Sequence, residues 1–174
     1  VPTWHDPPAQ AKTVIRLDPG LAFGTGTHPT TRMCLSWIAR HMPPQARVLD
    51  YGCGSGILAI GAALHGAQSV DAVDIDPAAV QATQENARAN ATRLHAGLPD
   101  QAQGQYQVVL ANILATPLKV LAPLLCQHVA PGGHLVLAGI LARQAEELQA
   151  AYAPMVTLTV ADEQEGWILM VAQR

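Results

Sequence analysis

The sequence predicts a doubly wound α/β fold around a mostly parallel sheet, and three observations support this prediction. An apolar run that starts at Val48 ends in a glycine-rich turn, Gly52–Gly56, and a helical pattern begins at once at Ile57. Apolar strands and helical patterns alternate along the rest of the chain. The last two strands are joined by a segment that is too short for a crossover helix, so they must be antiparallel. We therefore expect a seven-stranded sheet with an antiparallel C-terminal hairpin.

The composition is that of one globular domain. The chain has 174 residues, of which 49% are hydrophobic, so it can bury a core and is too apolar to remain disordered. Its formal net charge is −3 and its Lys and Arg residues form no cluster, which argues against direct binding of nucleic acid. The three cysteines and seven histidines follow no disulfide or metal-ligand spacing, so no metal site is expected. No signal peptide or membrane span is recognisable, and we expect a cytoplasmic monomer.

The N-terminal segment is rich in proline. Pro2, Pro7 and Pro8 predict an extended linker over residues 1–12 that arrives from a segment upstream. Thr13–Leu17 follows as a short edge strand. The folded domain is therefore expected to span residues 13–174.

Residues 18–31 are expected to form an irregular loop, because they contain three glycines, two prolines and four threonines. The loop is either a plain connector or a cover over a ligand, since it brings the ring of Phe23 and several hydroxyls to the start of a helix. That helix is expected to begin near Thr30 or Thr31 and to end before Pro43. The hydroxyl of Thr31 then caps the helix, contacts a carboxylate of the ligand, or does both.

The later elements follow in order, with weaker support only for the third strand. The predicted strands after Val48 cover residues 69–77, 93–96, 106–111, 134–139, 155–161 and 167–172, and the predicted helices after Ile57 cover residues 78–89, 117–128 and 142–153. Residues 131–133 and the acidic segment 162–166 are expected to be turns. Asp76 precedes Pro77 and is predicted to cap the helix that follows, whereas Asn86 and Asn90 are expected at its solvated or C-terminal positions.

Three polar signals converge on one edge of this sheet. The Gly52–Gly56 turn lets a ligand lie against bare main chain at the carboxyl end of the first strand. Asp74 stands 22 positions after Gly52, near the spacing at which an acidic residue binds a ribose in nucleotide-binding folds. Asn112 follows the fourth strand, the neighbour of the first at the point where the strand order reverses. Together they predict a nucleotide-like ligand at this edge.

The spacing of the glycines distinguishes between ligands. The dinucleotide fingerprint needs a glycine where this chain has Ile57, which argues against a nicotinamide oxidoreductase. Asp50 and the three glycines give D-x-G-x-G-x-G, which resembles motif I of class I methyltransferases that use S-adenosylmethionine. A tight turn that binds no ligand, or a nucleotide-binding module without catalytic activity, would also be compatible with these glycines.

A wider set of motifs resembles one family. The segment from Gly20 to Thr31, the Asp50–Leu58 turn, Val73–Pro77 and Ala111–Ala115 are similar to the bacterial methyltransferases of large-subunit ribosomal protein eleven, the PrmA family. The resemblance covers nearly the whole chain. It implies a Rossmann-like class I methyltransferase domain without the substrate-recognition domain that precedes it in the family, so that residues 1–12 are the remaining linker.

The resemblance also implies a reaction and a set of site residues. S-adenosylmethionine would be the cofactor, and lysine side-chain and N-terminal amines of that ribosomal protein would receive the methyl group. The implied cofactor-binding residues are Thr31, Gly52, Asp74 and Asn112, to which we add Gly54 and the loop residues Phe23, Thr25 and Gly26. Asn112 is the predicted catalytic residue: its side-chain oxygen and the carbonyl of Ile113 would hold the amine in line with the methyl group.

Some features have two interpretations. A class I methyltransferase for another protein or for a small-molecule amine would keep every cofactor feature. Cys53 is expected to fill the turn, because no histidine is placed to activate it as a nucleophile. His28 either braces its loop or lines a substrate channel. The acidic turn at residues 162–165 is a solvated hairpin tip, or it attracts a basic protein substrate.

Overall fold

A computed structural model describes residues 28–174 of the chain. The predicted linker at residues 1–12, the predicted edge strand Thr13–Leu17 and the loop residues Phe23, Thr25 and Gly26 lie outside the described residues.

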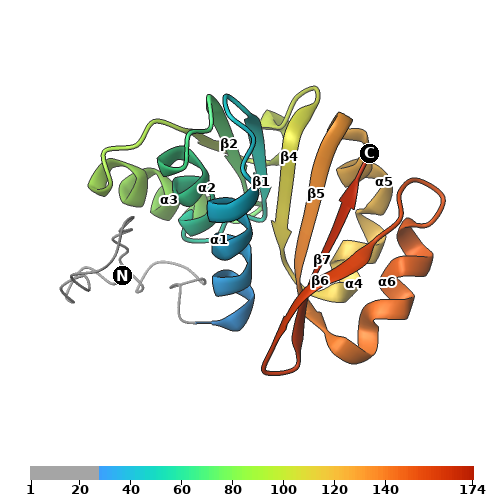
Figure 1. The fold of residues 1–174 in the computed structure, drawn as a ribbon. Coiled ribbons are helices and arrows are strands. Elements are labelled where there is room, and N and C mark those ends of the chain that lie inside the picture. The colour runs from blue at the N-terminus through green and yellow to red at the C-terminus, as the bar shows by residue number, and fades with distance from the viewer. Residues whose placement is uncertain (1–27) are drawn as a thin grey trace.

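The described chain forms the predicted seven-stranded sheet, with strand order β3-β2-β1-β4-β5-β7-β6 (Figure 1). The first five strands are parallel, and β7 runs antiparallel to both β5 and β6. The strand order reverses between β1 and β4, as expected, which places the carboxyl ends of these two strands side by side. The strands are β1 (Arg47–Tyr51), β2 (Ser69–Val73), β3 (His95–Gly97), β4 (Tyr106–Asn112), β5 (Val129–Leu141), β6 (Thr159–Gln164) and β7 (Trp167–Gln173).

Helices cover both faces of the sheet, so the fold has three layers (Figure 1). One face packs against α1 (Pro29–His41), α2 (Ile57–Leu64) and α3 (Pro77–Ala89). The other face packs against α4 (Ala115–Val120), α5 (Ala122–Gln127) and α6 (Ala145–Tyr152). Two short 3-10 turns, η1 (Pro99–Gln101) and η2 (Ala142–Gln144), complete the connections. The doubly wound α/β class is therefore confirmed.

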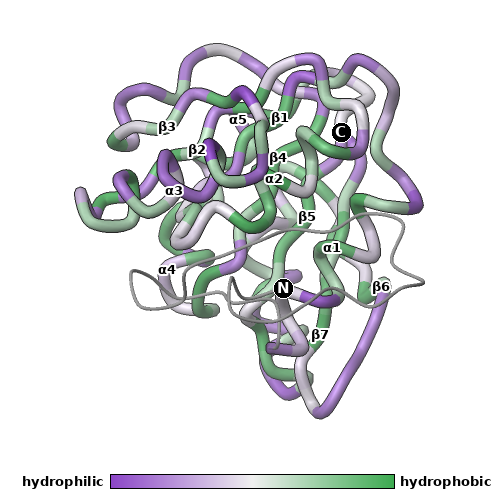
Figure 2. Tube along the Cα trace, turned by 90° about the vertical axis from the view of Figure 1, so that its left-hand side faces the viewer, coloured by the Kyte–Doolittle hydropathy of each residue, from purple (hydrophilic) through white to green (hydrophobic). Residues whose placement is uncertain are grey.

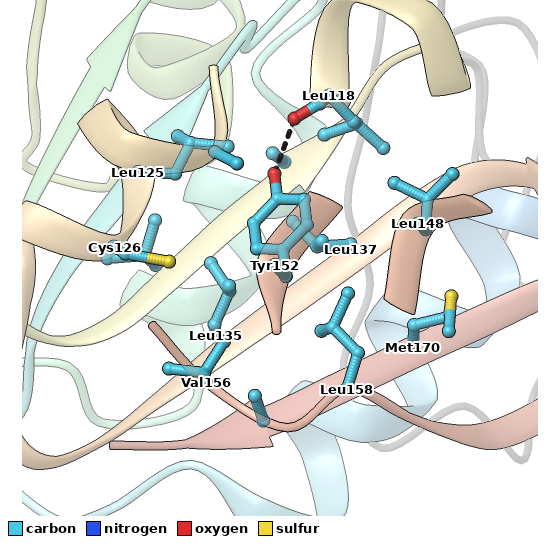
Figure 3. Close-up of a cluster of buried hydrophobic side chains, with 14 of the residues drawn as sticks. Leu118, Leu125, Cys126, Leu135, Leu137, Leu148, Tyr152, Val156, Leu158 and Met170 are labelled. Atoms are coloured by element: carbon cyan, nitrogen blue, oxygen red, sulfur yellow. Dashed lines mark hydrogen bonds between the residues drawn. The ribbon is translucent and has the colours of Figure 1, made fainter. Parts of the chain in front are cut away.

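The alternation of side chains along β4 explains the two cores. Val108 and Leu110 pack with the α1–α2 face, whereas Val109 and Ala111 pack with the α4–α6 face. Figure 2 shows the hydrophobic residues gathered along the central strands and the hydrophilic ones on the outer turns. In the second core the ring of Tyr152 is buried, and its hydroxyl donates a hydrogen bond to the Leu118 carbonyl at 2.6 Å (Figure 3).

Several predicted elements differ from the structure. The strand expected over residues 155–161 begins only at Thr159, and the one expected over residues 69–77 ends at Val73. The helix expected over residues 117–128 is two helices that meet at Leu121. The expected turn at residues 131–133 lies within β5, where the pairing with β4 shifts between Tyr106 and Val108. The expected acidic turn is shorter, because β6 continues to Gln164 and only Glu165 and Gly166, both with positive φ, make the turn.

A side chain of β1 accepts a hydrogen bond from an amide in the first turn of α2, which follows the glycine-rich turn. Gly56 is the N-cap of α2, has φ +86° and offers no side-chain acceptor. Asp50, only 1% exposed, supplies the acceptor instead: its Oδ2 receives the Ala59 amide at 3.2 Å. Burial raises the pKa of Asp50 to about 7, against the lowering effect of the Ala59 amide and with a smaller raising effect from Asp74.

The raised pKa makes the stability contributed by Asp50 depend on pH. The folded chain holds the Asp50 proton more tightly than the unfolded chain, so this contribution is complete below pH 3.8 and is lost as pH rises through about 7. We expect Asp50→Asn, which keeps an acceptor for Ala59 but cannot ionise, to gain stability relative to the parent chain between pH 4.5 and 8, by up to about 4 kcal/mol. Urea denaturation of both chains across this range measures the difference. A difference that does not change with pH would contradict the assignment.

Candidate functional site

A cavity of about 570 Å³ opens at the carboxyl edge of the sheet. It is lined by five of the residues that the sequence predicts to form the site: Thr31, Gly52, Gly54, Asp74 and Asn112. These residues come from α1, the β1–α2 turn, the end of β2 and the end of β4. The structure therefore brings together every predicted site residue that it describes.

One main-chain carbonyl accepts two amides of the glycine-rich turn where this turn leaves the sheet. The carbonyl of Val73, the last residue of β2, accepts both the Gly52 amide at 2.8 Å and the Cys53 amide at 2.9 Å. Gly52, Gly54 and Gly56 all have positive φ, which only glycine adopts without strain. The main chain of this turn consequently forms one wall of the cavity.

Helix α3 holds the turn through two polar side chains that the sequence reasoning missed. Thr83 donates to the Gly54 carbonyl at 3.1 Å and is fully buried. Asn86, only 2% exposed, donates to the Ser55 carbonyl at 2.9 Å, so its expected solvated position is wrong. Both donors satisfy carbonyls that the turn leaves without strand partners. Asn90 is the C-cap of α3, as expected.

Asp74 lies at the end of β2 with its carboxylate facing the glycine turn. Its Oδ2 accepts the Gly54 amide and its Oδ1 accepts the Asp76 amide, both at 3.0 Å. Each carboxylate oxygen can accept further hydrogen bonds, so Asp74 retains capacity for hydroxyl groups of a ligand. Asp76 accepts the Ala78 amide at 2.9 Å, which confirms that it caps α3.

His28, rather than Thr31, caps α1, which begins at Pro29. The Nδ1 atom of His28 accepts the Thr30 amide at 3.2 Å and lies 2.8 Å from the Thr30 hydroxyl. Its ring also meets the edge of Trp167 at a centroid distance of 5.1 Å, and both residues line the cavity. His28 therefore braces the start of α1 and lines the cavity as well. Trp167 is a site residue that the sequence reasoning did not identify.

Asn112 ends β4 on the face covered by α1. Its Nδ2 donates to the hydroxyl of Thr31 at 3.4 Å. The next residue, Ile113, is in close contact with two glycines: a Cβ at Gly52 would lie 2.7 Å from Ile113 Cγ2, and a Cβ at Gly139 would collide with the Ile113 carbonyl. Gly139, in β5, was not among the predicted site residues.

The thiol of Cys53 is unsuited to nucleophilic chemistry. Burial, with a smaller contribution from Asp50, raises its pKa to about 12, and its Sγ lies 3.3 Å from the Thr83 hydroxyl. The expectation that Cys53 fills the turn is consistent with this environment.

The lining of the cavity is chemically mixed. Asp50 and Asp74 are its only acidic lining residues within the described chain, and both adjoin the glycine-rich turn. The same lining also holds the amide of Asn112, the rings of His28 and Trp167, and the exposed apolar residues Leu114 and Pro117. The carboxylates suit a ligand with hydroxyls and positive charge, and the neutral groups suit an uncharged polar group on an apolar stem.

Two further features are absent over residues 28–174. No group of three His, Cys, Asp or Glu side chains in this range is arranged to hold a metal ion. No helix in the same range has the length and apolarity needed to cross a membrane.

Curated proteins are similar in amino-acid sequence to this chain. A protein named ribosomal protein L11 methyltransferase from Polaromonas sp. is 72% identical over 99% of this chain and 59% of its own length. One of the same name from Bordetella bronchiseptica is 58% identical over 98% of this chain and 59% of its own length. The chain thus spans about 59% of the length of these curated relatives.

Solved structures agree with this similarity. The ribosomal protein L11 methylase of Lactobacillus delbrueckii subsp. bulgaricus superposes with a TM-score of 0.91 at 36% identity, covering 100% of this chain and 93% of that chain. A T. thermophilus 16S rRNA methyltransferase shares the fold at a TM-score of 0.73 and 19% identity, covering 88% of this chain and 45% of that one. The profile of the family described as "Ribosomal protein L11 methyltransferase (PrmA)" matches residues 1–174, and the chain belongs to this family.

Proposed function

We propose that this chain is the catalytic part of a protein N-methyltransferase that transfers a methyl group from S-adenosylmethionine to lysine side-chain and N-terminal amines of ribosomal protein L11. The observation that carries the proposal is the shared cavity of the glycine turn, Asp74 and Asn112 in a member of this family. Residues 13–174 are proposed as the methyltransferase domain and residues 1–12 as the linker from a substrate-recognition domain. Because the proposed substrate is a ribosomal protein, we propose that the reaction takes place in the cytoplasm. The monomeric state and the lack of nucleic-acid binding remain predictions.

The residues around the glycine-rich turn fit S-adenosylmethionine. The positive φ of Gly52 and Gly54 leaves bare main chain against which the ligand can lie. Asp74 would accept the ribose hydroxyls, and the hydroxyl of Thr31 would contact the carboxylate of the methionine part. The sulfonium of the bound cofactor supplies an activated methyl group. Phe23, Thr25 and Gly26 are proposed to contribute to this site from the preceding loop.

The neutral residues of the cavity lining suit an uncharged amine. The Oδ1 of Asn112 can accept an amine N–H, and the apolar surface of Leu114, Pro117 and Trp167 can contact an unbranched alkyl stem. His28 is a poor general base, because Nδ1 already accepts from Thr30 and the neutral ring then carries its proton on Nε2. A free lysine has a pKa of about 10.4, and burial beside a positive charge lowers it. The site would therefore receive the neutral amine and act mainly by positioning it.

Two measurements test this function. Calorimetric titration with S-adenosylhomocysteine is expected to show micromolar binding, whereas NAD is expected not to bind, because the third glycine of its fingerprint is absent. Incubation with S-adenosylmethionine and purified ribosomal protein L11, followed by intact-mass measurement, is expected to show added methyl groups. Binding of NAD alone would contradict the proposed cofactor. Cofactor binding with methylation of a different protein or a small amine would contradict only the proposed substrate.

We expect Asp74→Ala to weaken binding of S-adenosylhomocysteine by about 10- to 150-fold, because it removes hydrogen bonds to a charged group worth about 1.5–3 kcal/mol. Calorimetry measures the affinity. Asp76→Ala is the matched control: it removes a helix cap two residues away and is expected to lower stability by about 1 kcal/mol while leaving affinity unchanged. Equal affinities for Asp74→Ala and the parent chain would place the ribose elsewhere.

We expect Asn112→Ala to slow methyl transfer by about 100-fold or more at saturating cofactor, because the amine loses the acceptor that holds it in line. Single-turnover transfer of a radiolabelled methyl group measures this rate. Asn90→Ala, which changes the same residue type at the end of α3, is expected to keep the parental rate. Parental rate and cofactor affinity in Asn112→Ala would rule out the proposed role of Asn112.

A further inference from the structure

The amide of Asn112 must be turned the right way to serve an amine. An amide group has one oxygen that accepts hydrogen bonds and one NH₂ that donates them, and a rotation of about 180° exchanges their places. Only the oxygen can accept an N–H from an amine whose lone pair attacks a methyl group. A carboxamide that is free to rotate would present the wrong half part of the time, so this inference concerns what fixes its orientation and rests on the proposed function.

The main chain at Asn112 is fixed by close packing. Ile113 is confined between Gly52 and Gly139, at positions where a Cβ atom on either glycine would collide with it. Asn112 also pairs with Ala138 in the register of β4 and β5. The backbone from which the amide projects therefore has little freedom, and the remaining freedom lies in the side-chain torsions.

Strand alternation then directs the side chain toward α1. Val108 and Leu110 pack on the α1–α2 face, and Asn112 is the next residue with the same parity. There its Nδ2 donates to the hydroxyl oxygen of Thr31, which is only 1% exposed and lies in the first turn of α1. Because the NH₂ half of the amide is directed at Thr31, the Oδ1 half faces away from it. The distance of 3.4 Å lies at the long end for an N–H···O hydrogen bond.

We propose that Thr31 is a positioning residue that acts through Asn112, in addition to its predicted contact with the cofactor. Its hydroxyl accepts from the Asn112 NH₂ and so holds the Asn112 oxygen toward the substrate amine. The same hydroxyl retains its own proton, which it can donate to the carboxylate of the cofactor. One buried hydroxyl would thus contact both the cofactor and the residue that holds the amine.

The rate test uses Thr31→Val, which keeps the shape of the side chain and removes the hydroxyl, and Thr31→Ser, which restores it. At saturating cofactor we expect Thr31→Val to lower the single-turnover methyl-transfer rate at least 10-fold and Thr31→Ser to recover most of it. Thr92→Val, the same change at the end of α3, is the control and is expected to keep the parental rate. A parental rate for Thr31→Val at saturating cofactor would overturn the proposal.

A double-mutant cycle separates this role from cofactor binding. If Thr31 acts through Asn112, then Thr31→Val costs no further rate in the Asn112→Ala background. If Thr31 contributes only by holding the cofactor, its effect on the dissociation constant of S-adenosylhomocysteine persists in both backgrounds, and Thr31→Val changes the rate at saturating cofactor in neither. Additive rate losses would overturn the proposal while leaving the proposed function intact.

A spectroscopic readout tests the contact without any activity. The chain has three asparagines, Asn86, Asn90 and Asn112, so selective ¹⁵N-asparagine labelling gives three side-chain NH₂ groups to assign. We expect the Asn112 NH₂ signals to shift and to exchange faster with solvent in Thr31→Val, to resemble the parent chain in Thr31→Ser, and to leave the Asn86 signals unchanged. Asn112 signals identical in Thr31→Val and the parent chain would overturn the proposal, even if no methyl transfer were found.

Discussion

The site depends on three glycines to which another part of the chain approaches too closely for a Cβ atom. Gly52 faces the side chain of Ile113, Gly56 faces Thr83 of α3, and Gly139 faces the Ile113 carbonyl. These contacts join β1, β4, β5 and α3 at one edge of the sheet. One wall of the cavity is consequently main chain, and polar groups beside it can be held without reorganising when a ligand binds. This packing fixes the main chain at Asn112, while the hydrogen bonds to Asp74 and the contact with Thr31 orient the two side chains.

The sequence was sufficient for the sheet, its antiparallel hairpin and most of the cavity, because each rests on a local pattern. Apolar strands and glycine turns determine where the chain reverses, and residues that follow parallel strands must meet at one edge. The local pattern predicted the wrong element where one long helix and two short helices are both compatible with the same residues. The helix expected over residues 117–128 breaks at Leu121 because Pro123 has no N–H to donate and favours the first turn of a new helix.

The missed residues all act over long sequence distances. The turn carbonyls of Gly54 and Ser55 need donors, and Thr83 and Asn86 supply them from a helix about thirty residues away. Thr83 and Asn86 are three residues apart on α3 and lie beside the buried Ala82 and Ala87, which indicates that both face inward. Asparagine on a helix more often faces solvent, so this indication was missed. Gly139 and Trp167 could not be found in this way, since their roles depend on the β5 and β7 register against the end of β4.

The cavity lining combines two carboxylates with neutral polar and aromatic groups, and the two kinds of group favour different ligands. Asp50 lies in the cavity wall with a pKa near 7 because burial disfavours its charged form. A cationic ligand near Asp50 favours the ionised carboxylate, and by linkage the ionised carboxylate favours the ligand. Asn112, His28 and Trp167 add a neutral amide and aromatic rings to the lining, and these stabilise an ammonium ion less than a carboxylate does. Under the proposed function, the cavity would therefore favour a cofactor with a positive charge together with an amine that has already lost its proton.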